Sequence, residues 1–404
     1  MKKVLLISRI ERDGSMLSYF MPYQIKRGIG NIDNSLYNSP VAAWNEGTDQ
    51  TVENIEGLYS FRYNDIDIDY KLFSSVSAVV NFESIIDSLS CKYDEVIVIQ
   101  SMFFLNGFEL PPKSGKFKTI FLNINEAFHA TDDSILKFLT DNKIISAGAF
   151  AHTHPNLYYE PFLNPMYFYY FYGFDQLSYT PIENTKTNLI GLYHRKNYKV
   201  WRDDLLSTIK TIADNDVCVY NETELKPQFF TELMRIHISS AWEKNHWTTY
   251  TDYISSVCGF VFETLNYNAF GGPSKSTHRN YITEKTLKAI LFSKLNIPFI
   301  MDMNPYDFLE LHKLGFWFMN SLFFDFDKVN SNEELAENMY NSIIKSVEYV
   351  SELAGDWGLD DTHKYLVESY GDKMQNNFDQ FMKYLEKPKN NDKLIEFILY
   401  GNRN

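Results

Sequence analysis

The chain has 404 residues, of which 45% are apolar and 16% are aromatic. A chain of this length and apolar content can fill two hydrophobic cores, which favours two α/β domains and argues against disorder. The formal net charge of −14 disfavours a protein whose main task is to grip a nucleic-acid backbone. The three cysteines, Cys91, Cys218 and Cys258, form no close-spaced pair, which is typical of reduced core residues in the cytoplasm.

The first predicted strand, Val4 to Ile10, begins almost at the start of the chain. Arg9 and Glu11 interrupt this apolar run too early for a secretory signal peptide. Elsewhere, no stretch reaches the roughly 18 to 20 apolar residues that a membrane span needs. We therefore expect a cytoplasmic protein without a membrane span.

Further short apolar runs predict a doubly wound sheet in the first part of the chain. Glu95 to Gln100 and Thr119 to Asn123 read as buried parallel strands, and Ser134 to Leu139 reads as a helix with Asp132 and Asp133 as candidate caps. In such folds, ligands bind at the carboxyl ends of the strands.

Three aspartates alternate with isoleucines at Asp65, Asp67 and Asp69. Alternation places their carboxylates on one face of a strand. The motif is comparable with an Asp-x-Asp metal site, but we interpret it as the exposed face of an edge strand.

A second series of elements starts near Asn188, after an aromatic- and proline-rich stretch. Its most legible unit is a helix from Glu284 to Leu295, a strand from Ile297 to Met301, and a helix from Tyr306 to Leu314 that Gly315 stops. The region from Glu333 to about Leu399 reads as largely helical, with breaks at glycines and Pro388. The other predicted elements of this series are strands at 189–193, 217–220 and 259–265 and a helix at 201–212.

The sharpest chemical signal is Thr283-Glu284-Lys285 at the start of a helix, after a strand and a polar loop. Free N–H groups and the positive end of the helix dipole favour anions there, and Lys285 adds a full charge. A leaving nucleoside diphosphate gains negative charge as the glycosidic bond breaks, so this arrangement can stabilise it without a metal. Without its context, Thr283-Glu284-Lys285-Thr286 is an ordinary capped first turn with Thr283 as the N-cap.

The context resembles a known donor site. Tyr281-Ile282-Thr283-Glu284-Lys285-Thr286-Leu287-Lys288-Ala289-Ile290, followed by Ile297-Pro298-Phe299-Ile300, is similar to the signature of α-1,3-fucosyltransferase-like glycosyltransferases. Gly259-Phe260-Val261-Phe262-Glu263-Thr264 resembles the Phe-Glu-Asn strand of that family, with Thr264 in place of Asn. Leu192-Tyr193-His194-Arg195 and Trp201-Arg202-Asp203-Asp204 are similar to the strand and helix that open its donor domain. The resemblance covers Asn188 to Phe316, about a third of the chain.

This resemblance implies the GT-B fold, in which two Rossmann-like α/β domains face a cleft, here with a helical C-terminal segment. We expect an acceptor-side domain at 1–165, an aromatic linker at 166–186, a donor domain at 187–370, and C-terminal helices at 371–404 that return to the first domain. The implied reaction is inverting, needs no metal or cofactor, and moves a sugar from a nucleoside-diphosphate sugar to an acceptor hydroxyl. Position by position, the resemblance implies that Arg202 and Lys285 contact the diphosphate. It places Glu284 and Tyr281 near the ribose or sugar, and Glu263 facing the sugar. Thr283, the N-cap of the donor helix, completes the implied donor-binding residues.

Several other residues are candidates for the cleft. Arg195 is an alternative to Arg202, which on its own reads as a helix-surface arginine. Lys275, His278 and Arg279 gather in a loop that is either a lid over the substrate or flexible surface, and this loop lacks P-loop spacing. His152 and His154 are cleft-lining hydrogen bonders or loop residues, because no third metal ligand accompanies them.

Inverting transfer needs a general base near the acceptor hydroxyl. Glu126 is the candidate because it follows the predicted strand 119–123 at its carboxyl end, although a carboxylate there is equally suited to cap the next helix. The aromatic run from Tyr158 to Tyr172 reads as core packing or as a surface that stacks sugars or bases.

Two alternatives to a glycan-directed enzyme remain at the level of sequence, and a third does not fit. A glycan or lipid-linked saccharide acceptor is favoured over a modified base in DNA, as in phage-type DNA glycosyltransferases, because of the acidic net charge. A non-catalytic protein that binds sugar nucleotides fits the departure at Thr264. A Rossmann oxidoreductase does not fit, because the segment after the first strand has only one glycine, Gly14.

Overall fold

The structure is a computed structural model, and the residues it describes are 2–10, 58–74, 92–101, 117–123, 132–146, 148–150, 154–162, 165, 185–193, 200–214, 216–220, 254–263, 278–328, 331–386 and 388–401. The chain divides into two compact units. Unit 1 comprises Met1–Phe171, Lys275–His278 and Glu386–Asn404, and unit 2 comprises Tyr172–Ser274 and Arg279–Leu385.

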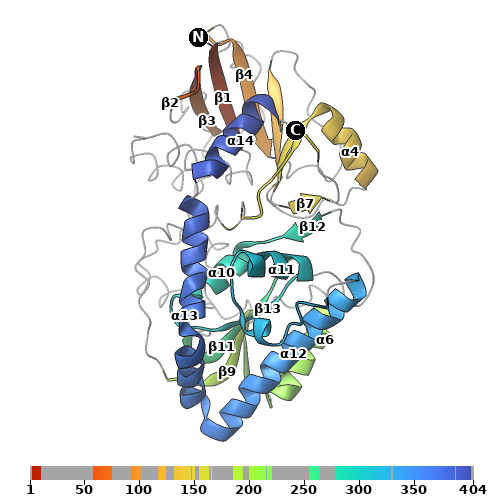
Figure 1. Cartoon of the computed structure of the whole chain (residues 1–404), viewed down its shortest axis with the longest axis vertical. Helices are drawn as coiled ribbons and strands as arrows, with labels where there is room; N and C mark the ends of the chain where they lie inside the picture. Colours follow the sequence, from red (N-terminus) through yellow and green to blue (C-terminus); the bar gives the residue numbers. More distant parts are fainter. Residues whose placement is uncertain are drawn as a thin grey trace. The chain divides into compact units, whose positions relative to one another are not determined.

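Unit 1 is built on a seven-stranded sheet with the strand order β2-β3-β1-β4-β5-β6-β8 (Figure 1). All neighbouring strands pair in parallel except β2, which runs antiparallel to β3 at the edge. The helix that precedes β6 is α4, Asp132–Asp141. The strands of this sheet are β1 (Lys2–Ile10), β2 (Leu58–Tyr63), β3 (Ile66–Ser74), β4 (Glu95–Ser101), β5 (Lys118–Asn123), β6 (Lys143–Ser146) and β8 (Leu157–Tyr159).

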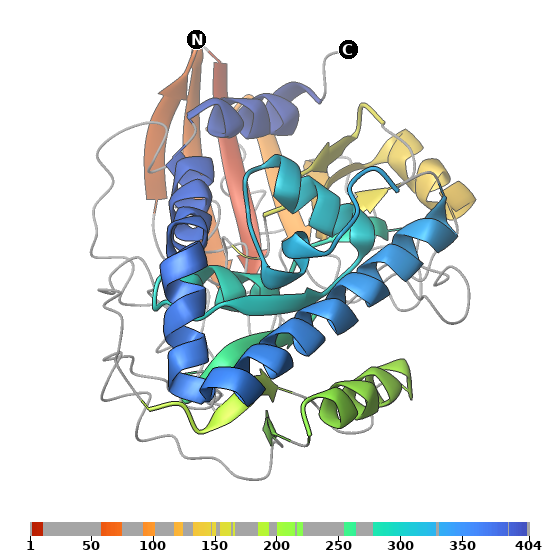
Figure 2. The ribbon, with the colours of Figure 1, turned by 60° about the horizontal axis from the view of Figure 1, so that its bottom comes forward.

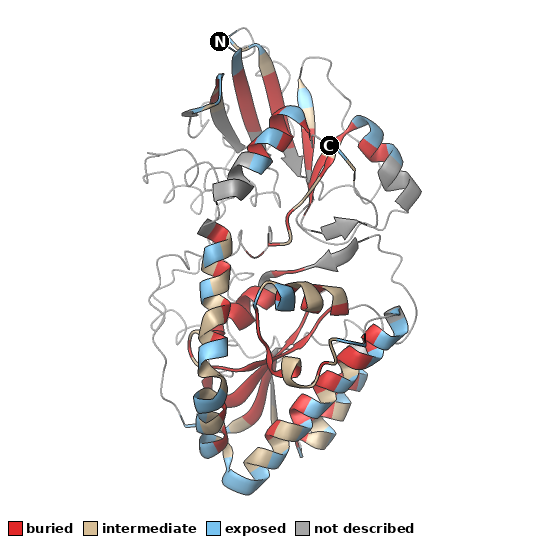
Figure 3. Ribbon diagram, in the orientation of Figure 1, coloured by how far each residue is buried: buried red, intermediate tan, exposed pale blue. Residues whose placement is uncertain are grey.

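The central strands of unit 1 are buried on both faces, as their apolar runs predict (Figure 3). Val4 to Ile7 of β1 and Val96 to Ile99 of β4 are each at most 4% exposed. Strand β1 lies between β3 and β4. The chain therefore first adds β2 and β3 on one side of β1, and then adds the strands from β4 onward on its other side. This reversal is the kind of switch point at which open α/β sheets bind ligands.

The aspartate motif does not lie on an edge strand. Strand β3 pairs with β1 on one side and with β2 on the other, and β2 is the edge. Asp67 accepts a hydrogen bond from Arg62 Nε at 2.8 Å, and Asp69 accepts one from Tyr93 Oη at 2.7 Å. The edge-strand prediction was therefore wrong. The outer side of β3 is covered by β2, and the sequence pattern of the aspartate motif does not show that a further strand pairs there.

Unit 2 is built on a smaller, fully parallel sheet with the order β10-β9-β11-β13 (Figure 1). Strand β9 is the first in sequence and lies between β10 and β11, so this sheet also has a switch point, between β9 and β11. Every residue of β11 and β13 is buried. The strands are β9 (Asn188–Tyr193), β10 (Val217–Tyr220), β11 (Ser256–Phe262) and β13 (Phe299–Asp302), with helix α6 (Val200–Ile212) between β9 and β10.

Two helices flank β13 in sequence. Helix α10, Glu284–Ser293, precedes it and buries Leu287, Ile290 and Leu291, as its apolar stripe predicts. Helix α11, Pro305–Lys313, follows it with Asn304 as the N-cap. Gly315 adopts a positive φ of 89° just after α11, the conformation in which glycine commonly ends helices. A short strand, β12 (His278–Tyr281), lies just before α10 in sequence.

The last third of the chain is helical. After the 3-10 helix η3 (Met319–Leu322), helices α12 (Asn332–Trp357) and α13 (Leu359–Glu386) form a V that meets at Gly358 (Figure 2). Gly358 has a positive φ of 81° and separates the two helices, whereas Gly355 and Gly371 lie inside them. An interior glycine costs only about 1 kcal/mol relative to alanine, which helix packing outweighs. The expected boundary at 371 therefore falls within α13.

The terminal helix α14, Pro388–Tyr400, belongs to unit 1. Lys143 Nζ donates hydrogen bonds to its last-turn carbonyls, Phe397 O at 3.2 Å and Ile398 O at 3.3 Å. The ring of Phe397 also packs on Tyr158. A cation at a helix C-terminus complements the helix dipole, so Lys143 anchors the end of α14. Among the described helices, none combines the length and the apolar character needed to cross a bilayer.

Candidate functional site

The candidate site lies at the carboxyl end of the unit 2 sheet, where β11 and β13 finish side by side. Phe262 and Asp302, the last residues of the two strands, are register partners. Glu263 follows β11 directly, and its backbone N–H extends the ladder by donating to Asp302 O at 2.7 Å. Parallel strands that end together at a switch point bring the residues after them into one place.

Glu263 fixes the start of α10 to the end of β11. Its carboxylate is fully buried and accepts four hydrogen bonds. Oε1 accepts from Thr283 N at 2.9 Å, Thr286 N at 3.1 Å and Thr286 Oγ1 at 2.6 Å. Oε2 accepts from Thr283 Oγ1 at 2.6 Å. Charge-assisted hydrogen bonds of this kind are roughly twice as strong as neutral ones, so the two segments are held firmly together.

Thr283 links this carboxylate to the next residue of the helix. Its hydroxyl donates to Glu263 Oε2 and accepts from Lys285 N at 3.3 Å, which makes it the N-cap of α10, as the sequence predicts. The backbone amides of Lys285 and Thr286 are therefore already hydrogen-bonded within the protein. The expectation that the first-turn N–H groups are free for an anion is wrong for these two residues.

The buried position of Glu263 changes its expected role. The resemblance gives it a contact with the donor sugar, but both carboxylate oxygens face the first turn of α10, and the residue is 0% exposed. Sequence patterns did not reveal this role, because the two partners, Thr283 and Thr286, lie about 20 residues further along the chain.

The other predicted donor residues lie on elements that begin at the same edge of the sheet. Lys285 is the second residue of α10 and is partly exposed. Arg202 is the third residue of α6, the helix that follows β9. Strands β9 and β11 are neighbours; α6 is the next described element after β9, and Glu263 ties the first turn of α10 to the end of β11. Glu284 begins α10 and Tyr281 ends β12, and for these two, as for Arg202, the structure describes the backbone alone.

The remaining candidates are placed in part. His278 and Arg279 are the first two residues of β12, with only their backbone described. His154 accepts a hydrogen bond at Nδ1 from Asn156 N at 3.1 Å, so its ring shapes the turn before β8. Phe162, from the aromatic run, is fully buried. Glu126, His152, Arg195 and Lys275 lie outside the described residues.

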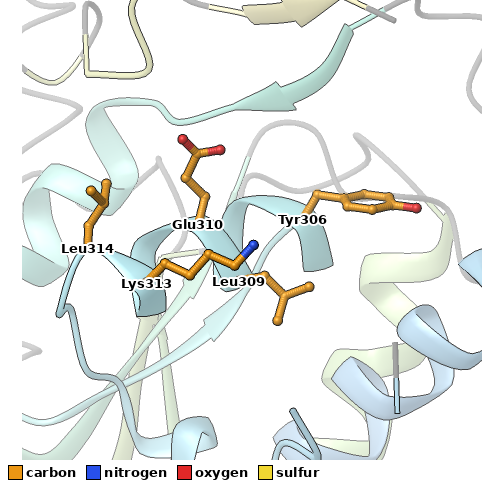
Figure 4. A pocket seen from close by; sticks show the side chains of 5 residues that line it. All are labelled: Tyr306, Leu309, Glu310, Lys313 and Leu314. Carbon is orange, nitrogen blue, oxygen red and sulfur yellow. The ribbon is translucent and has the colours of Figure 1, made fainter. Parts of the chain in front are cut away.

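A hollow that the sequence did not predict lies along α11 (Figure 4). It has a volume of about 320 Å³, and Figure 4 shows that its five lining side chains all come from α11 and the residue after it. The lining residues are three or four positions apart, so they share one face of α11. Any solvent-exposed helix face has this spacing, and the sequence therefore does not distinguish the hollow from ordinary surface. The lining residues are Tyr306, Leu309, Glu310, Lys313 and Leu314.

Comparisons with known proteins leave the family of this chain open. No protein-family model matches the sequence, and no curated protein matches it. Among solved structures, the chain is similar to a mutant of S. aureus TarM in complex with fondaparinux, alpha-GlcNAc-glycerol and UDP, with 11% identity and a TM-score of 0.25. The similarity covers 72% of this chain and 55% of the TarM chain. A TM-score of this size does not establish a shared fold, and the proposal below rests on this chain's own residues.

Proposed function

We propose that this protein is a glycosyltransferase that uses a nucleoside-diphosphate sugar, with the donor diphosphate at the carboxyl end of the unit 2 sheet. The observation that carries the proposal is the position of Lys285. Its place in the first turn of α10 is tied by hydrogen bonds to the end of β11, next to the switch point between β9 and β11. This is where open α/β sheets bind ligands, and the surrounding residues resemble a fucosyltransferase-like donor signature.

The chemistry of the leaving group explains why a lysine is useful here. When the glycosidic bond breaks, the bonding electrons stay on the diphosphate, which gains negative charge. Lys285 stabilises that charge, and Arg202 shares this role from the first turn of α6. Glu126 serves as the general base that takes the proton from the acceptor hydroxyl, and inversion at the anomeric carbon follows from a single displacement. The proposed reaction draws on no metal.

The proposed acceptor is a hydroxyl of a glycan or a lipid-linked saccharide. The net charge of −14 disfavours a long, phosphate-rich acceptor such as DNA. The two acceptor classes differ in their response to salt. Transfer to a saccharide should change little between 50 and 200 mM salt, whereas transfer to DNA should weaken steeply over roughly that range.

Ligand binding gives the first test, because it needs no knowledge of the acceptor. A panel of nucleoside diphosphates that includes GDP and UDP is screened for an increase in melting temperature. We expect one of them to stabilise the wild-type protein and Lys285→Ala to lose that stabilisation. The matched control is Lys294→Ala, which removes the same charge from the opposite end of α10. We expect this control to keep the response to ligand.

Turnover gives the second test. The substrates are sugar derivatives of the nucleoside diphosphate that the screen selects. With the one that the wild type turns over, Lys285→Ala should lower the release of nucleoside diphosphate about a hundredfold, the usual effect of removing one charge-stabilising group. Wild-type turnover in Lys285→Ala would overturn the proposed site. Tight binding of a nucleoside diphosphate without turnover against a broad panel of acceptors would instead favour a non-catalytic sugar-nucleotide-binding protein.

A further inference from the structure

A fully buried carboxylate at the edge of the proposed donor site needs an explanation. Moving a charged group out of water costs several kcal/mol unless hydrogen bonds and nearby positive charge compensate for it. Glu263 obtains four hydrogen bonds from Thr283 and Thr286 and lies at the positive end of the α10 dipole. This arrangement occupies the anion-binding capacity of the helix end with a carboxylate of the protein itself.

The opposite end of α10 is held as well. Gln375 of α13 donates to two backbone carbonyls there, Ser293 O at 3.3 Å and Lys294 O at 3.2 Å, and to Asn296 Oδ1 at 2.9 Å. Asn377, also on α13, donates to Ser293 Oγ at 3.2 Å. Both ends of α10 are therefore fixed by buried or partly buried side chains. A helix held at both ends has little freedom to tilt or fray.

Two described contacts lead from the buried carboxylate toward Lys285: Oε1 accepts from the amide of Thr286, the next residue, and the Thr283 hydroxyl contacts the amide of Lys285 itself. That hydroxyl donates its proton to Glu263 Oε2 and accepts from the amide of Lys285. A hydroxyl has one proton and two lone pairs, so it can make both contacts at once. Valine has nearly the same shape as threonine but can make neither contact, whereas serine can make both.

We infer that Glu263 is a positioning residue of the donor site: through Thr283 it fixes the backbone of Lys285, so that the lysine side chain meets the diphosphate in a set geometry. The inference rests on the proposed function. Misplacement of a positioned group by about 1 Å can cost a hundredfold in rate, so this fixing is important for turnover. The Glu263 carboxylate accepts from the amides of Thr283 and Thr286, and the Thr283 hydroxyl accepts from the amide of Lys285. The contact with the diphosphate is therefore assigned to the lysine side chain.

The test compares Thr283→Val with Thr283→Ser. Two quantities are measured: hydrogen exchange in the peptide that contains the first turn of α10, and the dissociation constant for the better of GDP and UDP by calorimetry. We expect Thr283→Val to raise exchange in that turn and to weaken nucleotide binding, each about tenfold, which corresponds to the loss of about one hydrogen bond. Thr283→Ser should stay within about twofold of the wild type in both measurements, because serine caps helices as well as threonine.

A matched variant separates positioning from stability alone. Ser293→Ala removes a buried hydroxyl at the other end of α10, where Ser293 Oγ donates to Ala289 O at 2.6 Å. This variant should lower the melting temperature yet keep the dissociation constant of the wild type. If Thr283→Val is too unstable to purify, Glu263→Gln replaces it, since glutamine keeps the shape of the side chain but loses the charge and one acceptor.

The outcomes distinguish the inference from the proposed function. Unchanged nucleotide binding in Thr283→Val, or in Glu263→Gln where that variant replaces it, would overturn the positioning role, even if exchange rises. Equal losses in Thr283→Val and Thr283→Ser would do the same, because the hydroxyl would then not be the link. The proposed function fails on separate results: wild-type turnover in Lys285→Ala, or binding of a nucleoside diphosphate by the wild type without any turnover.

Discussion

Asn320 pairs with the backbone of Met301 as though it were a residue of a neighbouring strand. Its Oδ1 accepts from Met301 N at 3.1 Å, and its Nδ2 donates to Met301 O at 2.9 Å. Met301 lies in β13, the last strand of the unit 2 sheet, and Asn320 is fully buried. The side-chain amide therefore covers an edge that would otherwise leave a backbone donor and acceptor unsatisfied.

Asn320→Asp should destabilise the protein by at least about 2 kcal/mol, because a carboxylate cannot donate to Met301 O and its charge would be buried. Denaturant unfolding measures the effect. The same substitution at Asn376, whose Nδ2 donates to Gly315 O at 3.0 Å on the surface, should cost less than about 1 kcal/mol. Equal losses at the two sites would show that the pairing with Met301 has no special value.

Gly259 and Phe299 are register partners on β11 and β13, and the phenylalanine ring lies over the glycine. A Cβ on residue 259 would lie 2.8 Å from Phe299 Cδ1 and closer still to two other ring atoms. Gly259→Ala should therefore cost about 1–3 kcal/mol through overpacking. Adding Phe299→Leu should recover part of that loss in a double-mutant cycle, and strictly additive losses would contradict the contact.

His363 should make the protein sensitive to acid. Burial, followed by repulsion from Lys186, lowers the pKa of His363 to about 4. Its Nε2 lies 3.0 Å from Asn296 O, and Lys186 is itself buried, with Nζ donating to Ile254 O at 2.6 Å. Between pH 6.5 and 4 the unfolded chain binds a proton at this residue that the folded chain does not. Stability should therefore fall as the pH decreases, by about 2 kcal/mol between pH 7 and 5.

The variant that checks this is His363→Gln, whose amide can still donate to Asn296 O but does not titrate. Unfolding free energies at pH 7 and pH 5 are compared for both proteins. The wild type should lose more stability than the variant on acidification. Parallel pH profiles would assign the acid sensitivity to other groups.

Cys258 should be inert in the folded protein. It is fully buried in β11, and burial raises the pKa of its thiol to about 12, so almost no thiolate forms at pH 8. A thiol reagent followed by peptide mapping should label Cys258 only after unfolding. Rapid labelling of Cys258 under native conditions would show that β11 opens locally.

Several buried strands were predicted from the sequence because their signal is local, although β11 (Ser256–Phe262) begins and ends three residues earlier than expected. A buried parallel strand needs a short apolar run, and Val217–Tyr220 matches its predicted bounds, while β4 and β5 match theirs to within one residue. Strand order is not local. Nothing in the composition of 58–63 shows that this segment pairs with β3, so the edge of the unit 1 sheet could not be predicted from the aspartate motif.

The site was predicted in part for the same reason. The N-cap at Thr283 is visible because cap and helix are adjacent in sequence. The capping role of the Glu263 carboxylate cannot be predicted, because its partners lie 20 and 23 residues later in the sequence and only the fold brings them together. The resemblance placed Glu263 near the donor but could not indicate whether its side chain faces the ligand or the protein.

The assignment of α14 to unit 1 has a practical consequence for exchanging parts of this protein. Unit 2 ends at Leu385, and Glu386–Asn404 belongs to unit 1. A gene fragment that ends after Phe171 would omit the helix to which Lys143 is anchored, and would leave the apolar side chains of Tyr158 and its neighbours uncovered. Chimeras that replace unit 2 therefore need a crossover before Glu386 as well as one after Phe171, so that the final 19 residues are retained from the original gene. The short segment Lys275–His278 also belongs to unit 1 and should be retained with them.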